Sequence, residues 1–262
     1  MSLTIAHADD AGFFSCCTVK LHYIVEYINE HHKLPTNINS DRLFTLYNPV
    51  PSTDITYTFF KPPHAYDYTY KNALIWHYKH QFEPYSMLDF ANILPLVKIY
   101  FEPSQTIKAI EHNLVKNYDI CHDNCIALYY RGTDKSCETL IDSYESFYNK
   151  LIELQQHINN KQIQILIQTD TSQFLEYMMS KLTDMKNVII IKELLPSHTN
   201  YGTHHERTKE QNYNDIQQLC AVVQIAAKCR YIICSSGSVS NWIVLYRGNA
   251  DNVYQNLNYK WI

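Results

Sequence analysis

The chain has 262 residues, of which 46% are hydrophobic and 18% charged, and its formal net charge is −4. This is the composition of a globular protein, and the negative balance argues against a broad nucleic-acid-binding surface, which needs a basic patch. Only 5 glycines are present, where an average composition of roughly 7% would give about 18. None of them forms a G-x-G-x-x-G or G-x-x-x-x-G-K-[ST] motif, which disfavours ordinary dinucleotide dehydrogenases and P-loop NTPases.

The cysteine content and the N-terminal residues bear on the cellular compartment. Eight cysteines in a chain of this length are too few for a disulfide scaffold. The first residues, Met1–His7, lack the basic and apolar regions of a signal peptide, and no apolar run approaches the length of a membrane span. We therefore expect a soluble, cytoplasmic protein of a reducing compartment, without a membrane anchor. Cys121 and Cys125 have no second pair beside them, so no metal site is expected.

The first half begins with one strand–loop–helix unit. A strand is predicted over Leu3–His7 and a helix over about 15–32, ending before Pro35. The alternating residues of Ile55–Phe60 predict a second strand. A helix over Gln105–Asn117 is expected to bridge the two halves of the chain.

The second half alternates short apolar runs with longer amphipathic stretches. Apolar, β-branched runs of this length are typical of strands buried on both faces of a sheet. Their alternation with helices predicts a parallel sheet with right-handed crossovers, and hence a doubly wound α/β domain. The strands are predicted at Cys125–Tyr130, Ile163–Ile167, Val188–Ile191 and Tyr231–Cys234, and the helices at about 143–158, 172–182 and 215–227. We place one α/β domain at 1–112 and a second, Rossmann-like domain at 113–262.

Polar residues follow three of these strands directly. Ligands of open parallel sheets bind beyond the carboxyl ends of the strands, so these residues are expected to meet at one edge. They supply a guanidinium, an ammonium, hydroxyls, carboxylates and a helix start, which is what a diphosphate requires. Each motif is also compatible with a turn or a helix N-cap that binds nothing. The segments are Arg131–Lys135, Gln168–Asp170 and Ser235–Ser238.

The same segments resemble a known family. Tyr129–Lys135, with the sequence Y-Y-R-G-T-D-K, resembles the H-x-R-R-x-D-K motif of the superfamily of α1,6-fucosyltransferases, nodulation fucosyltransferases and protein O-fucosyltransferases. Leu166–Asp170 resembles the family's strand ending in A-T-D-D, and Tyr231–Ser238 the strand ending in T-F-S-S. Gly202–Asn212 is loosely similar to its polar loop. Gly12 lies where these enzymes carry a glycine-containing loop.

The resemblance implies a GT-B-like α/β fold, with two Rossmann-like halves and a cleft between them, the C-terminal parallel sheet being the clearer. It makes 1–112 the acceptor-side domain and 113–262 the nucleotide-sugar-binding domain. It implies an inverting, metal-independent glycosyltransferase that moves a sugar from a nucleotide-sugar donor to a hydroxyl of an oligosaccharide or glycoprotein glycan. No cofactor beyond that co-substrate is implied. In the family, the residues matching Arg131 and Ser238 bind the donor diphosphate. The expected donor-binding residues are Gly12, Tyr129, Arg131, Thr133, Lys135, Asp170, Ser236, Gly237 and Ser238.

Three departures from the family pattern leave the donor open. The motif histidine, which helps to hold guanine in the α1,6 enzymes, is Tyr129 here, and the second arginine is Gly132. The helix acid that also contacts guanine falls near Val222. The donor is therefore GDP-fucose or a UDP-sugar such as UDP-xylose.

The expected catalytic residues are Arg131, Asp10 and Glu138. Arg131 would neutralise the departing nucleoside diphosphate, as a metal does in other enzymes. Asp10 and Glu138 are candidates for the base that takes the acceptor proton. The family's glutamate falls at Thr139 here, with Glu138 one position early, and Asp10 is equally compatible with a turn or cap residue. The alternative function is a non-catalytic nucleotide- or sugar-binding module of the same fold.

Overall fold

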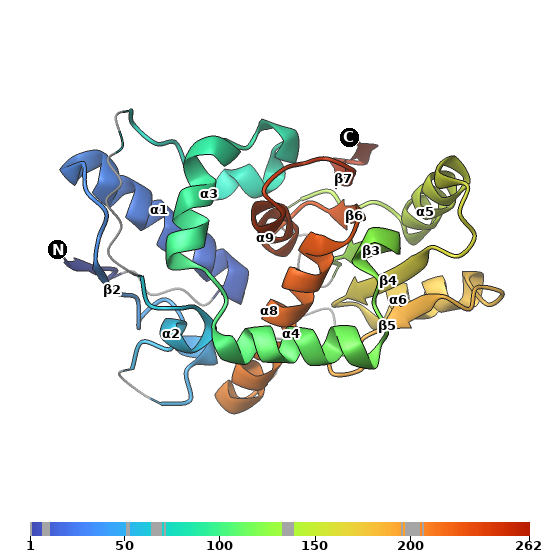
Figure 1. The fold of residues 1–262 in the computed structure, drawn as a ribbon, viewed down its shortest axis with the longest axis horizontal. Coiled ribbons are helices and arrows are strands. Elements are labelled where there is room, and N and C mark those ends of the chain that lie inside the picture. Colours follow the sequence, from blue (N-terminus) through green and yellow to red (C-terminus); the bar gives the residue numbers. More distant parts are fainter. Residues whose placement is uncertain are drawn as a thin grey trace.

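A computed structural model describes residues 2–6, 11–50, 53–63, 70, 72–132, 139–194, 196, 205 and 207–262. Within these ranges the protein has an N-terminal half and a C-terminal half built around a sheet (Figure 1). Helix α4 runs between the two halves and covers Gln105–Asn117, the residues predicted for it. Ser104, directly before the helix, is its N-cap. The Ser104 hydroxyl accepts a hydrogen bond from the backbone N–H of Ile107, which fixes the start of the helix.

The C-terminal half is organised by a six-stranded sheet with the order β5-β4-β3-β6-β7-β8. Neighbouring strands are parallel except for β8, which pairs antiparallel with β7. All four predicted strands are present. The strands are β3 (Cys125–Tyr130), β4 (Gln164–Thr169), β5 (Val188–Ile190), β6 (Tyr231–Ser235), β7 (Val253–Leu257) and β8 (Lys260–Trp261).

Helices cover both faces of this sheet. Along β3, Ile126, Leu128 and Tyr130 join one apolar cluster, whereas Ala127 and Tyr129 join the other. The first cluster includes residues of α5 and α6, and the second includes residues of α8 and α9. The predicted doubly wound arrangement is therefore confirmed. The helices are α5 (Tyr144–Ile158), α6 (Ser172–Lys181), α8 (Lys209–Lys228) and α9 (Ser238–Arg247).

The N-terminal half has less regular structure. Strands β1 (Ser2–Thr4) and β2 (Asn37–Asn39) form a two-stranded parallel sheet, joined through α1 (Phe13–His31), the predicted first helix. Between β2 and α3 (Phe90–Tyr100), the described elements are short. The short elements are the 3₁₀ turns η1 (Thr45–Tyr47), η2 (Tyr78–Phe82) and η3 (Tyr85–Met87), the helix α2 (Thr56–Phe59) and, after α4, the turn η4 (His122–Asn124).

The prediction of a strand at 55–60 is wrong, because Thr56–Phe59 is the helical turn α2. A carboxylate just before the turn decides this: Asp54 Oδ1 accepts hydrogen bonds from both the backbone N–H and the hydroxyl of Thr56. Such local capping offers the backbone an alternative to a strand ladder. Phe59 and Phe60 are both buried beside Phe13, so both rings enter one core although a strand would send them to opposite faces.

The two halves share one continuous core. The rings of Phe14 and Phe101 lie against Trp242, whose indole N–H donates to the hydroxyl of Thr18 over 2.9 Å. The predicted boundary at 112/113 falls within α4, and the division into two domains stays a prediction. Among the described helices, none has both the length and the apolar character that a membrane span requires.

Candidate functional site

The sheet has a topological switch point between β3 and β6. These strands are neighbours, but β3 leads through α5 to β4 on one side and β6 leads through α9 to β7 on the other. Crossovers that diverge in this way leave a crevice at the carboxyl ends of the two strands, where open α/β sheets bind ligands. Arg131 and Ser236 follow β3 and β6 directly, so two of the predicted site segments flank this crevice.

Arg131 is held at the crevice by Asp170. Its Nε lies 3.5 Å from Asp170 Oδ2, and the two side chains are 17% and 11% exposed. The backbone N–H of Arg131 donates to Ser235 Oγ over 3.0 Å, and that of Gly132 donates to Asp170 Oδ1 over 2.9 Å. The ends of β3, β4 and β6 are thereby tied together, and a mostly buried guanidinium is fixed at the carboxyl end of β3.

Gly132 has a steric role beside this pair. A Cβ atom at this position would lie 2.6 Å from a ring carbon of Tyr130 and 2.8 Å from Thr171 Oγ1. The Tyr130 ring is itself fixed, because it stacks on Phe174 with 4.1 Å between the ring centroids. Any larger residue would have to displace this aromatic pair, so the family's second arginine has no room here.

The turn at Gly12 is bonded to Tyr47. Burial raises the pKa of the Tyr47 phenol well above its usual range, and the positive charge of Arg131 acts in the opposite direction. The Tyr47 hydroxyl donates to the carbonyl of Ala11, directly before Gly12. Gly12 is the N-cap of α1, with an ordinary φ of −60°, and a Cβ atom at this position would meet no other atom within 4 Å. The Gly12 turn is therefore tied to Tyr47, a phenol on which the charge of Arg131 acts.

The Ser236–Ser238 turn is buried and held by residues that the sequence did not indicate. Ser238 Oγ donates to Gln81 Oε1 over 2.7 Å, and the Gly237 N–H donates to the Tyr85 hydroxyl over 3.1 Å. Ser236 Oγ donates to the carbonyl of Asn256 over 2.7 Å. These partners come from η2, η3 and β7, far away in the sequence, and no local motif marks them.

The same turn begins a helix. Gly237 has φ 155° and ψ 173°, a conformation that is essentially restricted to glycine, and it is the N-cap of α9. The first backbone N–H groups of a helix have no acceptor within the helix, and together with the helix dipole they favour an anion. Ser238 is the first helical residue, so these donors start beside the crevice.

The two positions at which the family contacts guanine lie together beneath the site. Tyr129 and Val222 line one small internal cavity of about 10 Å³, between β3 and α8. Both residues are buried, and Gln168 of β4 adds a polar side chain to the same lining. A space of this size is smaller than a nucleobase, and neither side chain is a histidine or an acid. Tyr129 as a donor-binding residue stays a prediction.

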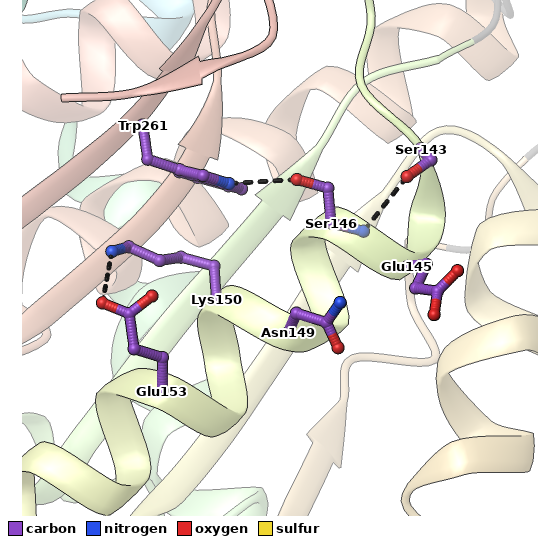
Figure 2. Close-up of a pocket in the computed structure, with 7 residues that line it drawn as sticks. All are labelled: Ser143, Glu145, Ser146, Asn149, Lys150, Glu153 and Trp261. Carbon is purple, nitrogen blue, oxygen red and sulfur yellow. Dashed lines mark hydrogen bonds and ion pairs between the residues drawn. The ribbon is translucent and has the colours of Figure 1, made fainter.

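A second depression, of about 350 Å³, lies on the outer side of α5 (Figure 2). Trp261 of β8 closes one side of it, and its indole N–H donates to Ser146 Oγ over 3.0 Å. Ser146 Oγ in turn donates to Asp142, and Lys150 pairs with Glu153. None of the described residues predicted for the site lines this depression. Its internal bonds fasten β8 to α5.

Part of the predicted site lies outside the described residues. These positions are Asp10, Thr133, Lys135 and Glu138, together with Gly202 of the predicted polar loop. Of the remaining predicted residues, Arg131, Asp170 and the Ser236–Ser238 turn lie at the carboxyl ends of β3, β4 and β6, and Gly12 lies at the start of α1. Their assignment to donor binding stays a prediction.

Comparison with known proteins bears on the fold. No protein-family model and no curated protein sequence matches the chain. Among solved structures, the chain is similar to the crystal structure of the NodZ α-1,6-fucosyltransferase soaked with GDP-fucose, with a TM-score of 0.57 and 12% sequence identity. The match covers 94% of this chain and 92% of that one. The fold is therefore α/β and GT-B-like, of the fucosyltransferase type, as the sequence resemblance implied.

Proposed function

We propose that the protein is a glycosyltransferase that transfers a sugar from a nucleotide-sugar donor to a hydroxyl of a glycan. The observation that carries this proposal is the Arg131–Asp170 pair beside the N-terminus of α9, at the switch point of the sheet. A guanidinium and helix amides at one crevice match the charge and hydrogen-bonding needs of a diphosphate. The likeness to a structure soaked with GDP-fucose supports the same class of ligand.

The proposed chemistry is an inverting displacement that needs no metal. The acceptor oxygen forms a bond to the anomeric carbon while the bond from that carbon to the diphosphate oxygen breaks. Negative charge develops on the leaving diphosphate, and a fixed guanidinium stabilises it electrostatically at that stage. Asp170 holds Arg131 in place for this role, since it bonds the side chain and the neighbouring backbone together.

The acceptor hydroxyl must lose a proton in this reaction. We assign the proton to a carboxylate, with Asp10 and Glu138 as the preferred candidates among the acids near the expected cleft. Thr133 and Lys135 complete the proposed donor contacts. Replacing each acid with its amide separates the two candidates. Only the replacement of the true base should lower kcat strongly while leaving nucleotide binding intact.

The proposed donor is GDP-fucose or a UDP-sugar such as UDP-xylose. The apolar surroundings of Tyr129 and Val222 favour a base contact that differs from the guanine contact of the α1,6 enzymes. Thermal shift with GDP, UDP, CDP and their sugars decides between the donors. A ligand at 100 times its Kd adds about 2.7 kcal/mol to the free energy of unfolding, which is readily detected. If none of these nucleotides stabilises the protein, the proposal is contradicted.

Arg131→Ala tests the residue that the proposal depends on most. We expect at least about a tenfold rise in the Kd of the nucleoside diphosphate and loss of sugar transfer, because charge-assisted hydrogen bonds to phosphate are among the strong ones. Arg230→Ala is the matched control, since Arg230 is an exposed arginine before β6, at the opposite edge of the same sheet. Full transfer activity in a folded Arg131→Ala variant would refute the assignment.

A binding module of the same fold is the second candidate. The observation that favours it is that the Ser238 hydroxyl and the Gly237 amide already have protein partners. Such a module would be stabilised by a nucleotide but would never release a nucleoside diphosphate. Release of nucleoside diphosphate from a nucleotide-sugar in the presence of an acceptor therefore excludes it.

A further inference from the structure

Two side chains from the N-terminal half close over the Ser236–Ser238 turn. Gln81 and Tyr85 are 5% and 1% exposed. The Tyr85 hydroxyl accepts from the Gly237 N–H over 3.1 Å and lies 3.2 Å from the carbonyl of the same residue, to which it donates. The main chain of Tyr85 is fixed as well, because its N–H donates to Gln255 Oε1 over 2.9 Å. The short helical turns η2 and η3 thus form a frame that holds Gln81 against Ser238.

The hydroxyl of Ser238 has a single proton to donate. In the structure this proton goes to Gln81 Oε1, so Ser238 offers a ligand only its lone pairs. A phosphate oxygen is an acceptor and needs a donor. The other end of the Gln81 amide, Nε2, is a donor of the same shape. Turning the amide by about half a turn would make Ser238 the acceptor and release its proton for a ligand.

We propose that Gln81 is a positioning residue of the nucleotide-sugar site, whose amide orientation decides whether Ser238 donates a hydrogen bond to the donor diphosphate. This inference rests on the proposed function. It assigns to a residue of the N-terminal half control over a ligand contact made by the C-terminal half. The amide turns about its own terminal bond, so the exchange needs no movement of the main chain that Tyr85 and Gln255 hold.

Two substitutions at Gln81 separate this role from a merely structural one. Gln81→Glu, measured at alkaline pH where the new carboxyl is ionised, leaves only acceptor oxygens beside Ser238. The hydroxyl proton then stays turned away from the ligand, and we expect the Kd of the best-bound nucleoside diphosphate to rise at least about tenfold. Gln81→Met has a similar size and no hydrogen-bonding group, so the proton of Ser238 is free for the ligand. For this variant we expect a Kd within about threefold of the wild type. If Gln81 acts only through its packing or its buried hydrogen bond, both variants should bind the nucleoside diphosphate weakly.

A double-mutant cycle removes the direct effect of the new charge. The Gln81→Glu penalty, measured by titration with GDP, UDP and CDP, should fall at least about threefold when Ser238→Ala is also present, because the hydroxyl that Gln81 orients is then missing. Gln164→Glu is the matched control. The amide of Gln164 bonds the main chain at Cys121 and Asp119, at the amino-terminal edge of the sheet. The Kd of the nucleoside diphosphate for this variant should equal that of the wild type.

The possible outcomes distinguish this inference from the function on which it rests. If the wild type binds none of the three nucleotides, both are overturned. If the wild type binds but Gln81→Met weakens binding as much as Gln81→Glu, only the role of Gln81 is overturned. The same holds if Gln81→Glu raises the Kd by the same factor with and without the Ser238 hydroxyl. Urea unfolding without ligand identifies any variant that is not folded.

Discussion

The two halves of the molecule are stabilised in different ways. The C-terminal sheet is built from continuous apolar strands, and all six residues of β3 are buried. The N-terminal half has a two-stranded sheet in the described residues, and buried side-chain hydrogen bonds join its segments in addition to an apolar core. Asn29, for example, bonds both the carbonyl and the N–H of Leu74. The first half therefore combines an apolar core with specific polar links, and the second relies mainly on packing of whole elements.

A buried lysine is the centre of this polar network. Lys20 is 2% exposed, and its ammonium donates to Ser40 Oγ over 3.0 Å and to Thr56 Oγ1 over 2.9 Å. Asp54 accepts from the main chain and hydroxyl of Ser40 and lies within reach of the lysine charge. The helix α1, the strand β2 and the turn α2 are joined through these groups. Removing one partner leaves the other polar groups buried without a hydrogen-bond or charge partner, which destabilises the fold.

The largest predicted effect concerns the junction of the two halves. Trp242→Ala removes a fully buried indole that contacts Phe14, Phe101 and the Thr18 hydroxyl. We expect a loss of about 3–5 kcal/mol in the free energy of unfolding, measured in urea. Because this core is continuous, one cooperative transition is expected in both proteins. Two separate transitions in the wild type would show that the halves unfold independently and would contradict the shared core.

The difference between the halves also explains how much could be predicted from the sequence. The strands and helices of the C-terminal half follow from apolar periodicity, and the predicted bounds of Gln105–Asn117 and Cys125–Tyr130 agree with the structure to the residue. The prediction at Thr56 is wrong because the conformation there depends on Asp54 and on contacts with Lys20, 36 positions earlier in the chain. Periodicity carries no information about such contacts.

The candidate site divides in the same way. Arg131 and Asp170 follow strands and could be placed at one sheet edge by topology alone. Gln81 and Tyr85 contact the site over 152 or more positions in sequence, from short 3₁₀ turns without a recognisable pattern. Only the tertiary structure brings them to Ser238. A signal for them would have to come from the pairing of distant residues, which a single sequence does not contain.

The two halves differ in the room that they leave around a glycine. Gly132→Ser should cost about 1–3 kcal/mol, because the new Cβ would meet the Tyr130 ring and Thr171 in a closely packed region. At Gly12 the space is open and the residue is the N-cap of α1 without a side-chain bond. Gly12→Ser should therefore stabilise the protein by about 0.5 kcal/mol. Equal effects of the two changes in urea unfolding would contradict this reading of the packing.

The buried lysine predicts a dependence of stability on pH. Burial lowers the pKa of Lys20 to about 8, while Asp54 acts to raise it. Since the pKa of an unfolded lysine is about 10.4, unfolding takes up a proton between these values, and the contribution of Lys20 to stability increases as the pH rises above 8. Below pH 8 both states are protonated and the contribution is constant.

Lys20→Met should remove this dependence. The difference in the free energy of unfolding between the wild type and the variant should shift by about 1–2 kcal/mol in favour of the wild type between pH 8 and pH 9.5. Any difference between the two proteins that does not depend on pH leaves this shift unchanged. The measurement is urea unfolding of both proteins at several pH values, and titration of other groups cancels in the difference. Parallel stability curves would mean that Lys20 titrates alike in the folded and unfolded chains.

The smallest predicted effect tests the edge of the C-terminal sheet. Trp261→Phe removes the indole N–H that bonds Ser146 but keeps an aromatic ring beside Phe147 (Figure 2). A single partly exposed hydrogen bond contributes about 0.5–1 kcal/mol, and we expect a loss of that order. Asn149→Ala, an exposed change in the same depression, should leave stability unchanged or raise it slightly, because alanine is the better helix former. A loss above about 2 kcal/mol in Trp261→Phe would mean that the Trp261–Ser146–Asp142 chain acts as a buried network like that of Lys20, and the contrast between the halves would then be one of degree.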